Sequence, residues 1–242
     1  MLSKRARLSI LAAGVLSGLL AITLWFGNTA LIALESSAPS RSTGTPAHGA
    51  LEHGRHLPSA GPNFRAYSRL GALLGRNSVH AVVRIVVLDA YAGLAAQRPD
   101  LTFVYGETGW PHGGPFPPHK THQNGLSVDF MVPVRDGNDR PVPLPTFPWT
   151  RFGYDLNFDE KGRLGDLRID FEAMGEHLAA LDAAARAHGT RIELFILAPE
   201  LQPFLWQTPA GRALQGRFPV MMTPAWVRHD EHYHVDFANP DG

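Results

Sequence analysis

The sequence predicts an α+β domain with a central, mainly antiparallel β-sheet flanked by helices, preceded by one transmembrane helix. Three observations support this prediction. Helical and strand-like patterns of apolar residues interleave beyond residue 63. Two strand-like segments, 126–132 and 229–237, lie far apart in the sequence but carry polar faces that suit one another. A mainly apolar, uncharged run from Leu8 to Leu34 follows several basic residues.

The N-terminal run is long enough to cross a membrane, which takes about 20 apolar residues. Lys4, Arg5 and Arg7 precede it, so this end is expected in the cytoplasm and the rest of the chain outside it. A cleaved signal peptide is the alternative, although its apolar region usually has only about 7–15 residues. Residues 1–34 are therefore expected to form a cytoplasmic stub and a transmembrane anchor, with the anchor in residues 8–34.

The next segment, residues 35–63, is expected to be a flexible linker. It is rich in serine, proline, glycine and histidine and has few large apolar residues. From residue 64 the composition becomes that of a folded domain, and residues 64–242 have a length that suits one domain.

Within this domain, the first helix is expected from about residue 78 to 97, capped by Asn77 and ended by Arg98-Pro99. A second, amphipathic helix is expected at 171–188, where apolar residues recur at helical spacing. Strands are expected at 101–105, 126–132, 152–158, 167–169, 191–198 and 229–237, short helices near 200–206 and 209–215, and an ordered proline-rich loop at 133–150.

Charge and composition exclude several classes of function. Lys+Arg and Asp+Glu are equal at 22 residues each and no basic patch stands out, so no nucleic-acid partner is expected. Cysteine is absent, which excludes disulfides, a thiol nucleophile and a thiolate metal site.

The histidines are unevenly distributed: six of the twelve fall in residues 112–122 and 229–234. In a strand, His232 and His234 share one face, and Asp129 lies on the polar face of the strand 126–132. If the two strands belong to one sheet, the three side chains meet on its exposed face, opposite the core. The turn signal Asn124-Gly125 lets the chain bring His122 back to the same point.

Together these residues offer ligands for one catalytic zinc ion, which commonly has three protein ligands and one open position. The pattern resembles the penicillin-insensitive murein endopeptidases, a family of the LAS zinc metallopeptidases. The resemblance covers about residues 65–240 and is carried by Gly113-Gly114-Pro115, His119-x-x-His122, Gly125-Leu126-x-Val128-Asp129 and His229-x-x-His232-x-His234.

The resemblance implies a role for each residue of these motifs. His122, Asp129 and His234 would be the zinc ligands. His232 would be the general base or would stabilise the transition state, and His229 and His119 would line the site.

Glu231 leaves the identity of the base open. It lies three residues before His234, the spacing at which D-Ala-D-Ala peptidases of the same group carry a glutamate base. The alternation of a strand places Glu231 on the face opposite His232 and His234, which favours His232.

By the same resemblance, the expected activity is hydrolysis of D-alanyl–meso-diaminopimelyl peptide crosslinks in peptidoglycan. The enzyme would act in the periplasm, anchored to the inner membrane by residues 8–34. Two alternatives remain. One is a D,D-carboxypeptidase or dipeptidase on the same scaffold, which Glu231 supports. The other is an inert cell-wall-binding regulator, which the retention of every ligand disfavours.

Overall fold

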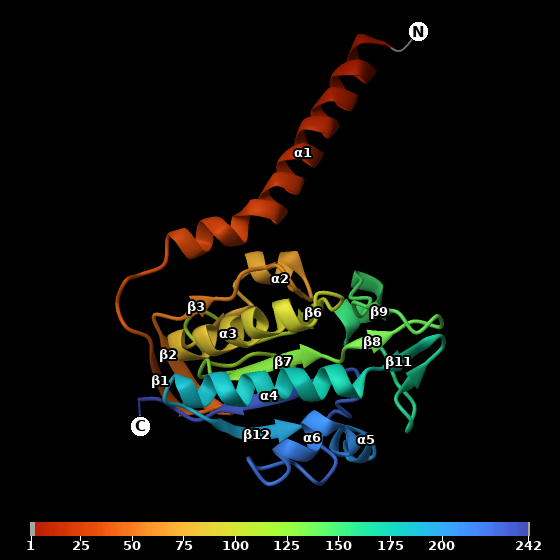
Figure 1. The fold of residues 1–242 in the computed structure, drawn as a ribbon. Coiled ribbons are helices and arrows are strands. Elements are labelled where there is room, and N and C mark those ends of the chain that lie inside the picture. Colours follow the sequence, from red (N-terminus) through yellow and green to blue (C-terminus); the bar gives the residue numbers. More distant parts are fainter. Residues whose placement is uncertain (1–2, 242) are drawn as a thin grey trace.

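The computed structural model describes residues 3–241 and shows a long helix, α1 (Lys4–Ala33), projecting from a mixed α+β body (Figure 1). Residues 1 and 2 of the expected stub and residue 242 of the expected domain lie outside the described part. The body is organised around a five-stranded sheet. Its strands, in spatial order, are β12 (Ile192–Ile196), β13 (His232–Phe237), β7 (Ser127–Met131), β6 (Phe103–Tyr105) and β4 (Phe64–Ala66).

This sheet is mainly antiparallel, and β4 is the strand that runs parallel to its neighbour, β6. The predicted α+β mixture is therefore confirmed. In the pairing of β13 with β7, His234 lies opposite Asp129 and Tyr233 lies opposite Phe130. Because side chains alternate along a strand, the first pair points to one face and the second pair to the other.

Two long helices cover the face that carries Phe130 and Tyr233. They are α3 (Ala81–Gln97) and α4 (Phe171–Ala187), which pack side by side (Figure 1). The rings of Phe130 and Tyr233 stack at 5.5 Å between centroids, and His177 of α4 contacts both. This layer is the hydrophobic core, so the polar face of β7 and β13 is the one available for chemistry.

Smaller elements complete the body. A second sheet contains β10 (Arg163–Leu164), β11 (Leu167–Ile169), β8 (Val134–Arg135) and β9 (Pro141–Val142). The short helices are α2 (Arg69–Leu73), α5 (Gln202–Gln207) and α6 (Pro209–Leu214). The expected proline-rich loop at 133–150 thus contains β8 and β9.

The first domain helix begins later than expected. Residues Ser78–Val79 form a short strand, β5, which pairs with β3 (Arg55–His56). The helix α3 is capped by His80, whose Nδ1 accepts from the Val82 N–H at 3.2 Å. Asn77, the expected cap, instead donates its side-chain amide to the Leu57 carbonyl, so its hydrogen-bonding capacity serves the loop before the helix.

The segment expected to be a flexible linker carries regular structure. Its first part forms a hairpin of β1 (Arg41–Thr45) and β2 (His48–Glu52). Leu51 is buried, and its backbone N–H donates to the His112 carbonyl at 3.1 Å. Strands pair through backbone N–H and C=O groups, and only proline lacks the N–H. The polar composition of this segment therefore did not reveal the hairpin.

The expected strand at 152–158 does not form. A 3₁₀ segment, Pro148–Gly153, stands there, and it contains three residues with left-handed backbone: Arg151 at φ 46°, Phe152 at 58° and Gly153 at 106°. Such backbone is unfavourable outside glycine and is often found at functional sites. Its consequence here is to direct the next residue, Tyr154, toward β7.

The helix α1 contains a 25-residue stretch, Ser9–Ala33, in which an 18-residue window has a mean hydropathy of 2.0. By length and composition this stretch could cross a membrane, and it could equally serve as a signal sequence.

His177 should make the stability of the fold depend on pH. It is fully buried in the core among the rings of Tyr91, Phe103 and Phe130. Burial lowers the pKa of His177 to about 3, whereas an unfolded histidine has a pKa near 6.5. The unfolded chain therefore takes up the proton first as the pH falls. The contribution of His177 to the free energy of unfolding is therefore fully present above about pH 6.5. It decreases by about 1.4 kcal/mol per pH unit as the pH falls toward 3.

The measurement is denaturant unfolding of the full chain in detergent between pH 7.5 and 4, compared with His177→Gln. The glutamine variant should unfold with a flatter pH dependence. His48→Gln, which changes an exposed histidine, should keep the wild-type slope. Identical slopes for the wild type and His177→Gln would show that His177 is not the neutral buried group described here.

Candidate metal centre

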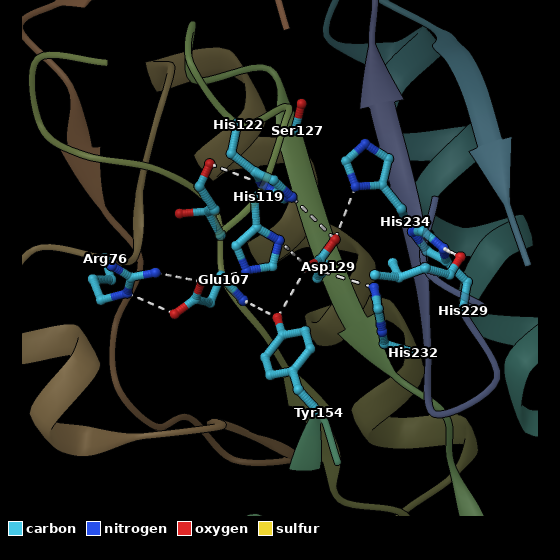
Figure 2. Close-up of polar contacts among 12 residues, drawn as sticks. Arg76, Glu107, His119, His122, Ser127, Asp129, Tyr154, His229, His232 and His234 are labelled. Carbon is cyan, nitrogen blue, oxygen red and sulfur yellow. Dashed lines mark hydrogen bonds and ion pairs between the residues drawn. The ribbon is translucent and has the colours of Figure 1, made fainter. Parts of the chain in front are cut away.

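Asp129 is the point at which the predicted site residues meet (Figure 2). Its carboxylate is completely buried. The oxygen Oδ1 lies 2.8 Å from Nδ1 of His234 and 3.2 Å from Nε2 of His122. The other oxygen, Oδ2, accepts a hydrogen bond from the Tyr154 hydroxyl at 2.9 Å and lies 3.7 Å from Nε2 of His232. The two oxygens therefore face two different groups of side chains.

The loop before β7 brings His122 to Oδ1, as the turn signal predicted. Gly125 has a φ of 75°, and a Cβ there would lie 2.6 Å from a methyl carbon of Leu51, so the position needs glycine. His122 itself has a φ of 68°. A left-handed histidine is unfavourable on its own, which indicates that the surrounding loop determines the position of this imidazole.

Each histidine beside Oδ1 has its second ring nitrogen held by an acceptor. Nδ1 of His122 donates to the Thr108 carbonyl at 3.2 Å, and Nε2 of His234 lies 2.9 Å from Oδ1 of Asp236. Metal-binding histidines are usually oriented in this way. With Nδ1 of neutral His122 protonated, its Nε2 and the Asp129 oxygen are both acceptors, and a cation between them would relieve their repulsion.

Beside Oδ2, too, each histidine has its second ring nitrogen held by an acceptor. His119 points Nδ1 toward this oxygen at 3.9 Å, and its Nε2 lies 2.6 Å from Oε2 of Glu107. His232 has its Nδ1 at 2.7 Å from Oε1 of Glu231. Burial would raise the pKa of Glu107, but His119 and Arg76 lower it to about 2, so it is an ionised partner.

The donor set suits a metal ion. One ligand atom each from His119, His122 and Asp129 lies within 4.8 Å of the others, so this group could hold a metal ion. It includes His119, which was predicted to line the site. The predicted ligand His234 contacts the same carboxylate, with its Nδ1 2.8 Å from Asp129 Oδ1. Imidazole and carboxylate ligands are those of catalytic zinc sites.

Strong electrostatic coupling accompanies this geometry. Burial alone would raise the pKa of Asp129, but the imidazoles of His122 and His232 hold it well below its usual range. Burial would lower the pKa of His234, yet the carboxylates of Asp236 and Asp129 raise it to about 10. Histidine binds metal only when neutral, so a metal ion that binds His234 must displace a proton.

Two expectations about the site face are corrected. The polar face of the sheet is not exposed, because the loop from Glu107 to His122 and Tyr154 cover it, and Asp129, His232 and His234 are buried. Glu231 does not point away from His232. It precedes the first residue of β13, so strand alternation does not apply to it, and its carboxylate contacts the His232 ring.

A cavity of about 410 Å³ opens beside His119 and His232, whose ring nitrogens lie 3.9 and 3.7 Å from Oδ2. Its polar lining includes His119, His232, Glu107 and Glu231, and its wall includes aromatic side chains from Tyr67, Phe152, Tyr154 and Trp226. His122 and His234 do not line it. Asp129 is thus buried, with His122 and His234 beside Oδ1, while the two histidines beside Oδ2 reach the cavity.

His229 lies next to His232, outside the cavity lining. Its Nδ1 donates to the Val227 carbonyl at 2.8 Å, and its ring centroid lies 4.5 Å from that of His232 and 6.3 Å from that of His234. Burial lowers the pKa of His229 to about 4, so it is a neutral neighbour of the site. It is not among the residues that line the cavity.

Tyr154 is a site residue that the sequence analysis did not identify. Its hydroxyl donates to Asp129 and accepts from the Glu107 backbone N–H at 2.8 Å. A Cβ at Gly106 would lie 2.5 Å from this hydroxyl oxygen, so glycine is needed there. The sequence was misleading at this position, because Tyr154 falls within residues 152–158, which were expected to form a strand.

Replacement of Tyr154 by phenylalanine should weaken metal binding by roughly 10–100-fold, the usual effect of losing a partner that orients a ligand. The ring packing against His119 and His232 would remain, so the fold should be retained. Competition with a chromophoric chelator measures the affinity. Tyr91→Phe is the matched control, since it removes a buried hydroxyl that has no partner among the described residues. Equal affinities for both variants would show that the Tyr154 hydroxyl does not position Asp129.

Comparisons with known proteins find no family model that matches the chain and no curated protein that matches it significantly. The functional proposal therefore rests on the residues and geometry of this centre and on the motif resemblance of the sequence.

Proposed function

We propose that this protein is a zinc-dependent peptidase that hydrolyses peptide crosslinks in peptidoglycan. The observation that carries the proposal is the division of groups around Asp129. His122 and His234 meet one carboxylate oxygen in a buried layer, while His119 and His232 face the other oxygen and line a cavity. A metal-assisted hydrolase requires ligands that hold the ion and titratable groups that reach the substrate. This arrangement supplies both.

In this proposal, His122, Asp129 and His234 hold the ion. Zinc bound there would act as a Lewis acid on the scissile carbonyl and would lower the pKa of water toward about 7. The geometry also supports His119 as a candidate ligand, because its Nδ1 lies within reach of the Asp129 carboxylate. Metal titration of His119→Gln separates the two assignments: a ligand variant loses the metal, and a cavity variant keeps it.

His232 is the proposed general base. Its Nε2 points toward Asp129 beside the cavity, and Glu231 accepts the Nδ1 proton at 2.7 Å, which fixes the ring and leaves Nε2 to exchange protons. An imidazole placed in this way can accept a proton from attacking water and donate it to the leaving amine, which contributes about 10²–10⁴-fold.

The His119–Glu107 pair occupies another part of the cavity lining. Arg76 contacts the same glutamate through two hydrogen bonds at 2.6 and 2.5 Å, which hold the carboxylate in place. With Nε2 of His119 donating to Glu107, Nδ1 of the neutral ring is an acceptor, so it can bind a metal ion or accept a hydrogen bond from a ligand without a large movement of the ring.

Peptidoglycan is proposed as the substrate on the resemblance of the motifs between residues 113 and 234. The D-alanyl–meso-diaminopimelyl bond is the specific target, and a periplasmic location follows from it. An N-terminal helix that could serve as an anchor or a signal sequence is compatible with that location.

The test is mass analysis of purified crosslinked muropeptide dimers after incubation with the full chain in detergent, with and without a chelator. Conversion of dimers to monomers that the chelator stops and added zinc restores is the expected result. Dimers that stay intact while the protein holds zinc would contradict the peptidase proposal and favour a binding protein.

A D,D-carboxypeptidase is the second candidate, because Glu231 lines the cavity together with His232 and because Arg151 lies on the same wall. Its exposed guanidinium contacts Asp155 at 3.4 Å and could pair with a terminal carboxylate as well. The same experiment separates the two activities, since a carboxypeptidase would release only terminal D-alanine and would leave the crosslink intact.

A further inference from the structure

The last turns of α1 are built into the domain. Asn28 is a polar residue within the apolar stretch, and only 2% of it is exposed. Its side-chain amide donates to the Leu57 carbonyl at 3.3 Å, and its Oδ1 accepts from the Ser59 backbone N–H at 2.7 Å. Both polar ends of the side chain are thus paired with one loop of the domain, which a detachable leader helix does not require.

Further contacts follow the same stretch of helix. The guanidinium of Arg69, the first residue of α2, lies 3.7 Å from the ring centroid of Trp25. A Cβ added at Gly27 would collide with Leu73 of α2, so the two helices approach closely there. After the helix, Glu35 accepts from the His56 backbone N–H at 2.6 Å and from Arg84 at 2.7 Å. Figure 1 shows these turns of α1 lying over α2.

The length of the remaining helix matches a membrane. From Ser9 to Gly27, a rise of about 1.5 Å per residue gives about 28 Å. The hydrocarbon core of a bilayer is about 30 Å thick. If this part spans the bilayer, Asn28 lies where the hydrocarbon ends. Trp25, less than one turn before Asn28, then lies at the edge of the hydrocarbon, close to the headgroups, where tryptophan is enriched.

With α1 placed in this way, the helix α2 would lie at the membrane surface, where it presents an apolar edge. Leu70 is 47% exposed and Leu74, its C-cap residue, is 60% exposed, although both belong to an element that packs against α1. Lipid is the occupant that this position indicates, because α1 would enter the bilayer beside these two leucines. Their burial there would stabilise docking by removing apolar surface from water.

We propose that α1 is retained as part of the folded domain and that α2 docks the domain on the lipid surface through Leu70 and Leu74. The domain that carries the candidate metal centre is then held at a fixed position relative to the membrane. Cleavage of α1 would remove Asn28 from Leu57 and Ser59. This proposal concerns placement on the membrane and is independent of the chemistry at Asp129.

The absence of cysteine makes the test direct. Single variants Leu70→Cys, Leu74→Cys and Ala183→Cys of the full chain are labelled with a fluorophore and reconstituted in vesicles of phosphatidylethanolamine and phosphatidylglycerol. Ala183 is an exposed residue of α4, which Figure 1 shows away from α1. Lipids with a nitroxide near the headgroup should quench labels at residues 70 and 74 several-fold more than the label at residue 183. Equal quenching at the three positions would overturn the proposal.

Asn28→Leu tests the role of the docked turns. It keeps the apolar helix and hence the membrane attachment, but it removes both hydrogen bonds to the loop. Quenching at residue 74 should fall toward the value at residue 183 while the protein stays in the membrane fraction. Unchanged quenching would show that α1 does not hold α2 at the surface. The intact mass of protein extracted from membranes should correspond to a chain that includes α1, and a chain lacking α1 would overturn retention.

Discussion

Replacement of Asp129 by asparagine should abolish both metal retention and hydrolysis. The carboxylate is completely buried and faces His122 and His234 through one oxygen and Tyr154 through the other. Asparagine keeps the shape but removes the charge that stabilises a cation in this buried position. The loss in metal affinity should therefore exceed the roughly 10–100-fold effect of an orienting partner such as Tyr154.

Metal content of the purified variant, measured by mass spectrometry of the eluted metal, checks this prediction together with the muropeptide assay. Asp166→Asn is the control, because Asp166 is exposed, belongs to the turn between β10 and β11 and does not line the cavity. Circular dichroism establishes that both variants are folded. A folded Asp129→Asn variant with normal metal content would show that this carboxylate is not a ligand.

Replacement of His232 by glutamine should leave metal binding intact and reduce turnover by roughly 10²–10⁴-fold, the contribution of a general base. His232 Nε2 is 3.7 Å from Asp129 Oδ2, on the cavity side, whereas the proposed ligands lie at Oδ1. Glu231→Gln should cost less, because the glutamine carbonyl can still accept the Nδ1 proton while the negative charge is lost.

The order of the two losses decides the identity of the base. If Glu231→Gln loses more turnover than His232→Gln, proton transfer belongs to Glu231. The carboxypeptidase hypothesis requires that assignment. His112→Gln serves as the control, because His112 is an exposed loop residue that does not line the cavity. Zinc content is measured for every variant, so that a lost metal is not mistaken for a lost base.

The alternation of side chains along two strands predicted much of the centre. It placed Asp129, His232 and His234 on one face, and the Asn124-Gly125 turn explained how His122 joins them. The structure brings these residues together in one buried cluster. Local periodicity was sufficient here because β7 and β13 are regular strands in direct register.

Residues outside regular elements could not be placed in the same way. Tyr154 reaches Asp129 only because three consecutive residues adopt left-handed backbone, and two of them, Arg151 and Phe152, are not glycine. Glu231 lies one residue before its strand, so the alternation rule gave the wrong direction. The hairpin of β1 and β2 forms in spite of its polar composition, because the loop that carries His122 contacts it. For example, the Gln123 backbone N–H donates to the Pro46 carbonyl at 2.9 Å.

The position of β13 also has a consequence for biosynthesis. It follows the other strands of the central sheet in chain order, yet it lies in the interior of that sheet, between β12 and β7. While the ribosome extends the chain at about 5–20 residues per second, β7 and β12 are made without the strand that joins them. His232 and His234 arrive with it, so a nascent or prematurely terminated chain lacks a complete sheet and two of the histidines around Asp129, and the candidate site is completed only in a late step.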